Sequence, residues 1–394
     1  MRLSAWASVA LMSILPAFSL GQEGSSLPIP LDSLTFDRVH LVSKVLRLDR
    51  VNNQVEEGLA TDEPKYPKQG EEVAVLGFVL KARDPQGQRV LIGPWGVAKA
   101  QGLILQDIRL LPSVEREKFK LTWFKIEPTR GKDGKGFSNE QWILKDGQAQ
   151  KVWAWDTLRY QEFVWDSANS WTKIASVCPV QLDPHDFGTM RFKVEVSYRG
   201  RKAVSEGIET MEKDGDIRAH RISVRGNTGN DLLDWAFSFF NLPYIWGSAS
   251  ITRRDEDHQA EKYIGADCAD FVVCAARRAG YGVPYRGSQY LKPYTLPIAR
   301  PDTVNLKGAY LDRDRTVLVD DSDPKAVHRG DLVLWSNHVA MFAADNGNGI
   351  LDTGDEVVQI LFHEPARLPI QEAYAGSFAV VRFKPGLKKT SGNH

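Results

Sequence analysis

Strict alternation of apolar and polar residues runs through the chain between about residues 33 and 224. In MRFKVEVSY (190–198) every second residue is apolar, and FKLTWFKI (119–126) repeats the pattern. A period of two places the apolar side chains on one face of a strand, so that one face is buried and the other is wet. A third predicted strand, EEVAVLGFVLKA (71–82), ends at the turn signal DPQG. These strands predict an all-β, sandwich-like domain over residues 33–224.

The hydrophobic period changes near residue 225. Apolar residues between Leu232 and Phe240 fall on one helical face, and Asn230 or Asp231 can cap its start. A second helix is predicted to begin at Cys268. Four short apolar runs that read as strands follow it: DLVLW, HVAMFA, EVVQILF and FAVVRF. Helices followed by strands predict an α+β domain over 225–386, with its helices packed on an antiparallel sheet.

The N-terminus has the features of an export signal. Arg2 precedes an apolar run, and the small residues Ser19 and Gly21 stand before Gln22. The run is shorter than the ~20 residues that a spanning helix needs, and no second run of this kind follows. We therefore expect a signal peptide over residues 1–21, no integral membrane span, and a mature protein located in the periplasm or the extracellular space.

Charge and cysteine content limit the possible partners and the chemistry. The chain of 394 residues has 50 Lys and Arg against 50 Asp and Glu, so its formal net charge is zero. This balance gives no net positive charge that would attract nucleic acids or an anionic membrane surface, and we expect no nucleic-acid partner. The three cysteines are an odd number, so at least one thiol stays unpaired in an oxidising compartment.

One of these thiols has the position of a nucleophile. GADCADFVVCAARRAG (265–280) places Cys268 in the first turn of the predicted helix, where converging N–H groups and the macrodipole favour a thiolate and predict a lowered thiol pKa. His338 begins the strand HVAMFA directly after a turn, and from there its imidazole can reach a helix N-terminus as a general base. Cys274 lies on another helical face and is predicted to pack in the core.

Three blocks resemble, in the same order, the NlpC/P60 family of cysteine peptidases. They are PYIWGS (243–248), GADCADFV (265–272) and RGDLVLWSNHVAMF (329–342), and the resemblance covers roughly residues 228–385. It implies the papain-like fold of that family, with Cys268 as nucleophile and His338 as general base and then acid. It also implies that Tyr244, near the nucleophile, is a substrate or oxyanion contact. Trp246, Asp267 and Asp270 are further expected substrate contacts.

The third catalytic residue is expected on the strand after His338. The strands HVAMFA and GILDTG are joined by DNGNG, whose glycines and asparagines favour a tight hairpin, so that Asp352 returns towards His338. A carboxylate there can hold the tautomer of the imidazole. A shift in register would instead give this role to Asp355 or His363.

Two features depart from the family pattern. Ala269 and Asp270 replace the serine and glycine that usually follow the cysteine, and residues 249–263 form an insert longer than the usual link between the tyrosine block and the cysteine. The insert is either a lid or specificity loop, or a solvated surface loop.

The resemblance implies a secreted thiol protease that hydrolyses peptide stems of cell-wall peptidoglycan, most commonly at D-γ-glutamyl-diaminopimelate bonds, with no cofactor. A metal site is not expected, because the eight histidines are scattered and HEP (363–365) lacks the second histidine of HExxH. Two alternatives stay open: a catalytically lapsed domain that binds the wall, and a related amidase or acyltransferase that uses the same residues.

The predicted β domain has no assigned ligand. Seven tryptophans lie in it, at positions 95, 123, 142, 153, 155, 165 and 171. They either fill the core or, if exposed, stack on sugar rings. A role of this domain in binding the wall or a protein partner therefore stays open.

Overall fold

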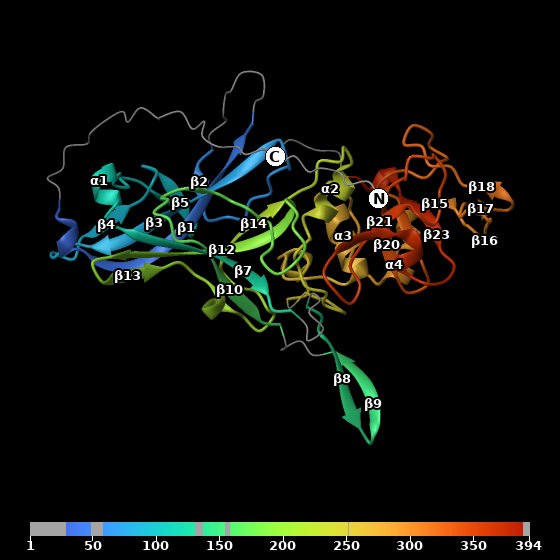
Figure 1. The fold of residues 1–394 in the computed structure, drawn as a ribbon, viewed down its shortest axis with the longest axis horizontal. Helices are drawn as coiled ribbons and strands as arrows, with labels where there is room; N and C mark the ends of the chain where they lie inside the picture. The colour runs from blue at the N-terminus through green and yellow to red at the C-terminus, as the bar shows by residue number, and fades with distance from the viewer. Residues whose placement is uncertain (1–28, 49–57, 131–136, 154–157, 251, 389–394) are drawn as a thin grey trace, which may run out of the picture.

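The computed structural model describes residues 29–48, 58–130, 137–153, 158–250 and 252–388. The predicted signal peptide, residues 1–21, lies outside the described residues. Figure 1 shows an elongated molecule, with the N-terminal strands in blue to green at one end and the yellow to red C-terminal part at the other.

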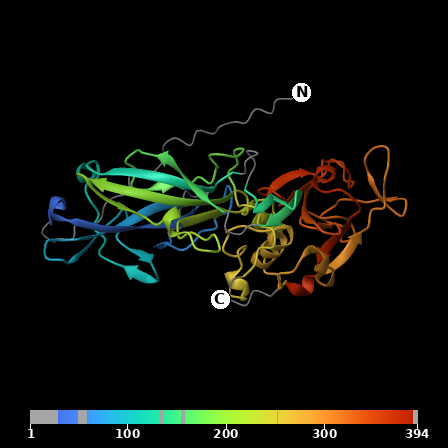
Figure 2. The ribbon, with the colours of Figure 1, turned by 90° about the horizontal axis from the view of Figure 1, so that it is seen from below.

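Two sheets share one core in the N-terminal part. The first has the order β11-β3-β1-β2-β5-β6, with β4 paired to β3, and the second has the order β10-β7-β12-β13, with β14 paired to β12. Figure 2 shows them as two layers. Phe78 of the first sheet and Trp123 and Phe192 of the second are fully buried in the shared core, because the alternation of each strand turns its apolar face inward.

The strands of these sheets have the following bounds. The first sheet comprises β1 (Thr35–Arg47), β2 (Ala60–Thr61), β3 (Glu72–Arg83), β4 (Arg89–Ile92), β5 (Ala98–Ala100), β6 (Leu103–Leu105) and β11 (Lys173–Ile174). The second comprises β7 (Lys120–Pro128), β10 (Tyr160–Asp166), β12 (Gly188–Tyr198), β13 (Arg201–Val204) and β14 (His220–Val224). Helix α1 (Ser113–Arg116) precedes β7.

The tryptophans of this part take different places. Trp123 and Trp171 are buried in the shared core, and the Trp123 Nε1–H donates to the Ser170 carbonyl at 3.0 Å. Trp95 and Trp165 are partly buried at the edges of their clusters. The side chains of Trp142, Trp153 and Trp155 lie outside the described part. The structure therefore decides in favour of packing only for Trp95, Trp123, Trp165 and Trp171.

A third antiparallel sheet organises the C-terminal part, in the order β15-β23-β19-β20-β21-β22. Phe271 of α3 and Val339, Met341 and Val358 of the sheet belong to one core cluster, which also buries Cys274 completely, as predicted. The elements are α2 (Asp231–Phe237), α3 (Cys268–Arg278), α4 (Ile370–Ala373), β15 (Thr295–Ala299), β19 (Leu332–Leu334), β20 (Val339–Ala344), β21 (Glu356–Gln359), β22 (Ala366–Pro369) and β23 (Ala379–Phe383). A small sheet adds β16 (Thr303–Val304), β17 (Tyr310–Asp312) and β18 (Arg315–Thr316).

The predicted fold class is wrong. The protein is mostly β, with 40% strand and 13% helix, several sheets and only four helices in its described part, and it does not have the expected α+β papain-like domain with helices packed on a sheet behind a sandwich-like domain. The physical reason is that the helical pattern of apolar residues extends over only a few turns in each segment. Asn230 caps α2, which ends after seven residues, and α3 with eleven residues is the longest described helix.

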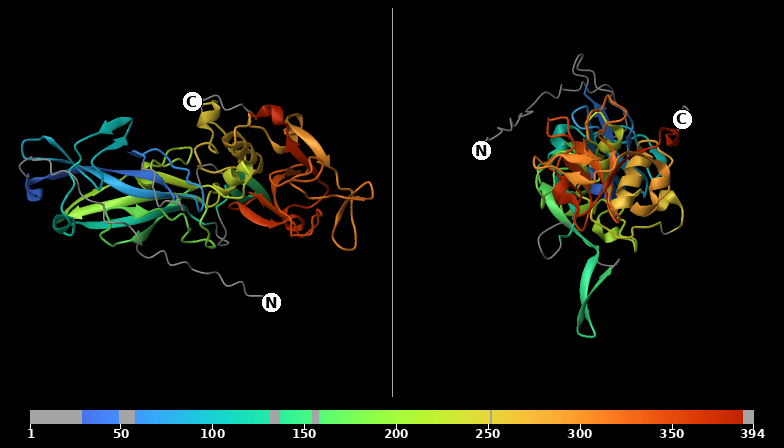
Figure 3. Two further views of the ribbon diagram at one scale, coloured as in Figure 1. Left: turned by 90° about the horizontal axis from the view of Figure 1, so that it is seen from above. Right: turned by 90° about the vertical axis from the view of Figure 1, so that its right-hand side faces the viewer.

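A hairpin projects from the junction of the two parts. Strands β8 (Glu140–Lys145) and β9 (Gln148–Trp153) pair only with each other and extend away from the body (Figures 1 and 3). The residues just before the hairpin turn back onto the C-terminal part, because the Tyr244 N–H donates to the Phe137 carbonyl at 3.0 Å. The N-terminal part therefore reaches the segment that carries the PYIWGS block.

Within the described ranges, no helix is long and apolar enough to cross a membrane.

Candidate active site

Cys268 is the first residue of α3. Asp267 is its N-cap: one carboxylate oxygen accepts the N–H groups of Ala269 at 3.0 Å and Asp270 at 2.9 Å. This local arrangement follows from the sequence, since an aspartate before a helical run satisfies backbone donors that have no partner within the helix. The helix start predicted at Cys268 is confirmed, and the cysteine is 8% exposed.

His338 lies directly before β20 and is fully buried. Its ring stacks on Tyr374, with centroids 5.0 Å apart, and packs against Trp335 at 5.5 Å. The Nε2 atom lies 2.5 Å from Oε1 of Gln359, the last residue of β21. Two aromatic rings and one amide therefore fix the orientation of the imidazole.

The Gln359 amide also assigns the tautomer of His338. Its Nε2–H donates to the Ala373 carbonyl at 3.3 Å, which turns Oε1 towards the ring. Because an amide oxygen only accepts, the proton of the neutral imidazole sits on Nε2 and the lone pair on Nδ1. This Nδ1 atom is buried and has no hydrogen-bond partner in the described part of the chain. It is therefore an available proton acceptor.

The thiol of Cys268 faces the start of β20. The Val339 N–H interacts with the sulfur and lowers the thiol pKa in part, and Val339 directly follows His338. Cys268 and Val339 also belong to the same core cluster. The structure thus places the start of α3 next to the start of β20, while the Nδ1 atom of His338 makes no hydrogen bond to the Cys268 sulfur.

Burial holds both groups in their neutral forms. Desolvation, with a further contribution from the Asp267 charge, raises the pKa of the Cys268 thiol to about 12. Desolvation lowers the pKa of His338 to about 4, against the opposing effect of the Gln359 hydrogen bond. The prediction of a lowered thiol pKa is therefore wrong, because in a nearly dry site the desolvation penalty exceeds the stabilisation from the helix N-terminus.

This raised pKa predicts how Cys268 reacts with alkylating reagents. Below its pKa, the thiolate fraction grows about tenfold per pH unit, so we expect the alkylation rate of Cys268 to keep rising from pH 6 to pH 9 without a plateau. We also expect the more exposed Cys178 to react first in the folded protein. Mass spectrometry of iodoacetamide-treated protein measures both rates, and a plateau for Cys268 near neutral pH would contradict the raised pKa.

Asp352 is not the residue that the structure places against His338. Its carboxylate accepts from the side-chain amides of Asn346 at 2.8 Å and Asn348 at 2.7 Å, and from the Gly354 N–H at 2.7 Å. The reason is that residues 345–355 form a long loop instead of a tight hairpin, and β21 starts only at Glu356. Gln359 replaces Asp352 as the third polar residue of the candidate site.

The two rivals of Asp352 also lie elsewhere. The Asp355 carboxylate accepts the N–H groups of Asn346 and Asp352, both at 3.0 Å, and thus closes the same loop. Burial raises the pKa of Asp355 to about 6. His363 lies beyond the end of β21, and its Nδ1 atom is buried with no hydrogen-bond partner in the described part.

The four expected substrate contacts differ in exposure. Trp246 is 46% exposed, whereas Tyr244 is buried, with its ring edge-on to Phe362 at 5.7 Å. Asp267 caps α3. Asp270 is also buried, accepts the Ser248 hydroxyl at 2.5 Å and lies 3.7 Å from His258. Three of the four are therefore part of the support beneath the nucleophile.

Asp267 and Asp270 are close enough to influence each other. Desolvation raises the pKa of Asp267, and for Asp270 desolvation and then the Asp267 charge raise the pKa well above its usual range. The raised pKa favours the protonated form of Asp270, whose carboxyl accepts the Ser248 hydroxyl. The departure from the family pattern at this position adds a buried polar contact beneath the helix start.

The insert at 249–263 does not lie free. Its second half packs under α3: Tyr263 is fully buried, and the Glu261 carboxylate accepts from Arg277 Nε at 2.7 Å and from the Tyr285 hydroxyl at 3.0 Å. His258 stacks on Tyr285 with centroids 3.7 Å apart. These contacts make this half of the insert part of the domain core. It is therefore neither a lid nor a solvated loop.

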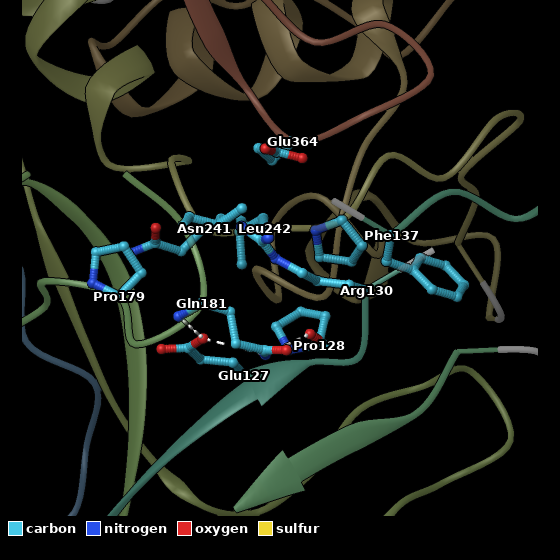
Figure 4. Close-up of a pocket in the computed structure, with 11 residues that line it drawn as sticks. Glu127, Pro128, Arg130, Phe137, Pro179, Gln181, Asn241, Leu242 and Glu364 are labelled. Atoms are coloured by element: carbon cyan, nitrogen blue, oxygen red, sulfur yellow. Dashed lines mark hydrogen bonds between the residues drawn. The ribbon is translucent and has the colours of Figure 1, made fainter. Parts of the chain in front are cut away.

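A small pocket lies at the junction of the two parts (Figure 4). It has about 320 Å³ of empty space, part of it open to solvent, and Glu127, Pro128, Leu242 and Glu364 are among its lining residues. Glu127 is held by Gln181, as the dashed line shows. The residues that line it do not include Cys268, His338 or Gln359, so this pocket is not the site of the thiol.

Metal chemistry has no support in the described ranges, which contain no group of three His, Cys, Asp or Glu side chains able to hold an ion. Comparison of the chain with protein-family models, with curated proteins and with solved structures finds no match. The function is therefore inferred from the residues of this chain. Sequence reasoning missed Gln359, and the signal that could have found it is a single amide in the otherwise apolar run VVQILF.

Proposed function

We propose that the protein is an exported cysteine peptidase that hydrolyses peptide stems of cell-wall peptidoglycan. The observation that carries the proposal is the His338–Gln359 hydrogen bond, which leaves Nδ1 with a lone pair and no partner beside the helix that begins at Cys268. A thiol, an oriented imidazole and an amide that holds the imidazole are the groups that covalent cysteine catalysis requires. The resemblance of three sequence blocks to the NlpC/P60 family supplies the substrate class.

The neutral forms of both groups determine the course of the reaction. As the Cys268 sulfur attacks the carbonyl carbon of the scissile amide, Nδ1 of His338 takes the thiol proton, and the Gln359 oxygen stabilises the resulting imidazolium through Nε2–H. Nδ1–H then protonates the leaving amine, and a thioester remains. Water attacks the thioester with His338 again as base, which releases the acid and restores the thiol.

Digestion of purified wall fragments tests this function. We expect mass spectrometry to show cleavage between D-γ-glutamate and diaminopimelate in stem peptides, the bond that the family resemblance implies. Cleavage at another amide would keep the chemistry but change the substrate bond. If no covalent change occurs in any fragment, the proposed peptidase function fails.

One observation favours a second candidate function, a wall-binding module without activity. His338 is fully buried and Cys268 is 8% exposed, so the described conformation gives a substrate carbonyl little access to the sulfur. In that case the protein binds stem peptides without cleaving them. Calorimetric titration with the same wall fragments distinguishes the two, because the module binds them unchanged whereas the peptidase converts them.

A further inference from the structure

The N-terminal part of the chain contributes a segment to the candidate active site. Residues 137–139 run parallel to 243–245: the Tyr244 N–H donates to the Phe137 carbonyl at 3.0 Å, and the Asn139 N–H donates to the Tyr244 carbonyl at 3.4 Å. On the other side of Tyr244 lies Ala266, whose carbonyl accepts the Ile245 N–H at 3.0 Å. A short three-stranded arrangement thus joins residue 139 to the residues just before Cys268.

The Asn139 side chain binds both the backbone N–H and the backbone carbonyl of Trp246. Its Oδ1 accepts the Trp246 N–H at 2.9 Å, and its Nδ2–H donates to the Trp246 carbonyl at 3.3 Å. The asparagine itself is only 2% exposed. A buried amide that satisfies both backbone groups of one residue fixes that residue strongly, because loss of the amide leaves a donor and an acceptor without partners.

The residues after Trp246 hold the start of α3. The Gly247 N–H donates to the Asp267 carboxylate at 3.2 Å, and the Ser248 hydroxyl accepts the Asp267 N–H at 3.3 Å. Trp246 is the expected substrate contact with the largest exposure. Asn139 therefore binds the backbone of the residue that carries the exposed indole, and the next two residues along the chain bind the cap of the nucleophile's helix.

From these contacts we infer that Asn139 is a positioning residue of the candidate active site, which the N-terminal β-rich part supplies to hold Trp246 where the peptide substrate binds. This inference rests on the proposed function. It assigns to the N-terminal part a direct role in substrate binding, separate from any binding of the wall by its own sheets. Asn139 acts through Trp246 and takes no part in bond cleavage.

Exchange and kinetics together test the inference. In Asn139→Ala we expect hydrogen–deuterium exchange at the Trp246 amide to accelerate at least ~10-fold, because its acceptor is lost. We expect KM for a wall peptide to rise roughly 10-fold with kcat within about 2-fold, the pattern of lost substrate binding with intact chemistry. Asn139→Asp keeps an oxygen that accepts the Trp246 N–H but loses the donor to the Trp246 carbonyl, and we expect its exchange rate and KM to lie between those of the wild type and Asn139→Ala.

Asn169→Ala is the matched control, since Asn169 is an exposed asparagine between β10 and β11 whose amide bonds the Arg116 carbonyl at 2.7 Å. It should change neither exchange at Trp246 nor KM. Unchanged exchange in Asn139→Ala overturns the inference, and so does accelerated exchange with an unchanged KM. If the wild-type protein cleaves no wall peptide, the proposed function fails, but accelerated exchange in Asn139→Ala alone still supports the hold on Trp246.

Discussion

Replacement of Cys268 by alanine is expected to abolish cleavage of wall peptides, with kcat reduced at least ~10³-fold, while the fold persists. The thioester cannot form without the sulfur, and catalysis from substrate binding alone is all that remains. The side chain is small and lies at the first position of α3, where Asp267 and not the cysteine caps the helix. We therefore expect the free energy of unfolding to change by no more than about 1–2 kcal/mol.

Two further variants make this result specific. Cys268→Ser keeps nearly the same volume but offers a hydroxyl in place of the thiol, and it should be as inactive as the alanine variant. Cys178→Ala removes a partly exposed cysteine of the N-terminal part and should retain full turnover. Turnover of wall peptides by Cys268→Ala would exclude covalent chemistry at Cys268. A wild-type protein that binds wall peptides but does not cleave them would favour the binding module.

Local alternation predicted individual strands well. The strands expected at 71–82, 119–126 and 190–198 correspond to β3 (Glu72–Arg83), β7 (Lys120–Pro128) and β12 (Gly188–Tyr198). Each has a buried apolar face, and this face is a property of the strand's own residues. The fold class could not be obtained in the same way, because it depends on how short elements with weak patterns pair across the C-terminal part.

The assignment of Asp352 shows why pairing is the difficult step. The segment that contains it was expected to form the second strand of a hairpin with HVAMFA. In the structure this segment pairs with residues distant in the chain: the Tyr310 N–H donates to the Leu351 carbonyl at 2.9 Å, and the Leu351 N–H donates to the Val317 carbonyl at 2.8 Å. The loop residues favour a turn, but they carry no information about these distant partners.

The thiol pKa was mispredicted for a related reason. The position of Cys268 at a helix start is readable from ADCAD, since an aspartate before a helical run is a cap signal. Its burial depends on β20, which lies about 70 residues further along the chain. The sequence therefore predicts that the helix N-terminus lowers the thiol pKa. The larger effect, desolvation, raises this pKa and depends on the tertiary structure.

Loss of the Gln359 side chain is expected to lower kcat about 10²-fold in Gln359→Ala, with a stable fold and little change in KM. Gln359 accepts the Nε2–H of His338 and keeps the lone pair on Nδ1, so its removal leaves a buried donor unpaired and lets the ring adopt the unproductive tautomer. Asp352→Ala is the matched comparison. It should destabilise the 345–355 loop but leave kcat near the wild-type value, because the Asp352 carboxylate binds Asn346 and Asn348.

The pH profile separates this positioning role from a merely structural one. Because burial lowers the pKa of His338 to about 4, kcat/KM of the wild type should fall only as the pH drops below about 5. Gln359→Glu retains an acceptor for Nε2–H, and its negative charge favours the imidazolium, which raises the pKa of His338. The acidic limb should therefore move to higher pH in this variant, with kcat partly restored relative to Gln359→Ala. An unshifted limb, or a loss of kcat in Asp352→Ala equal to that in Gln359→Ala, would contradict the role of Gln359.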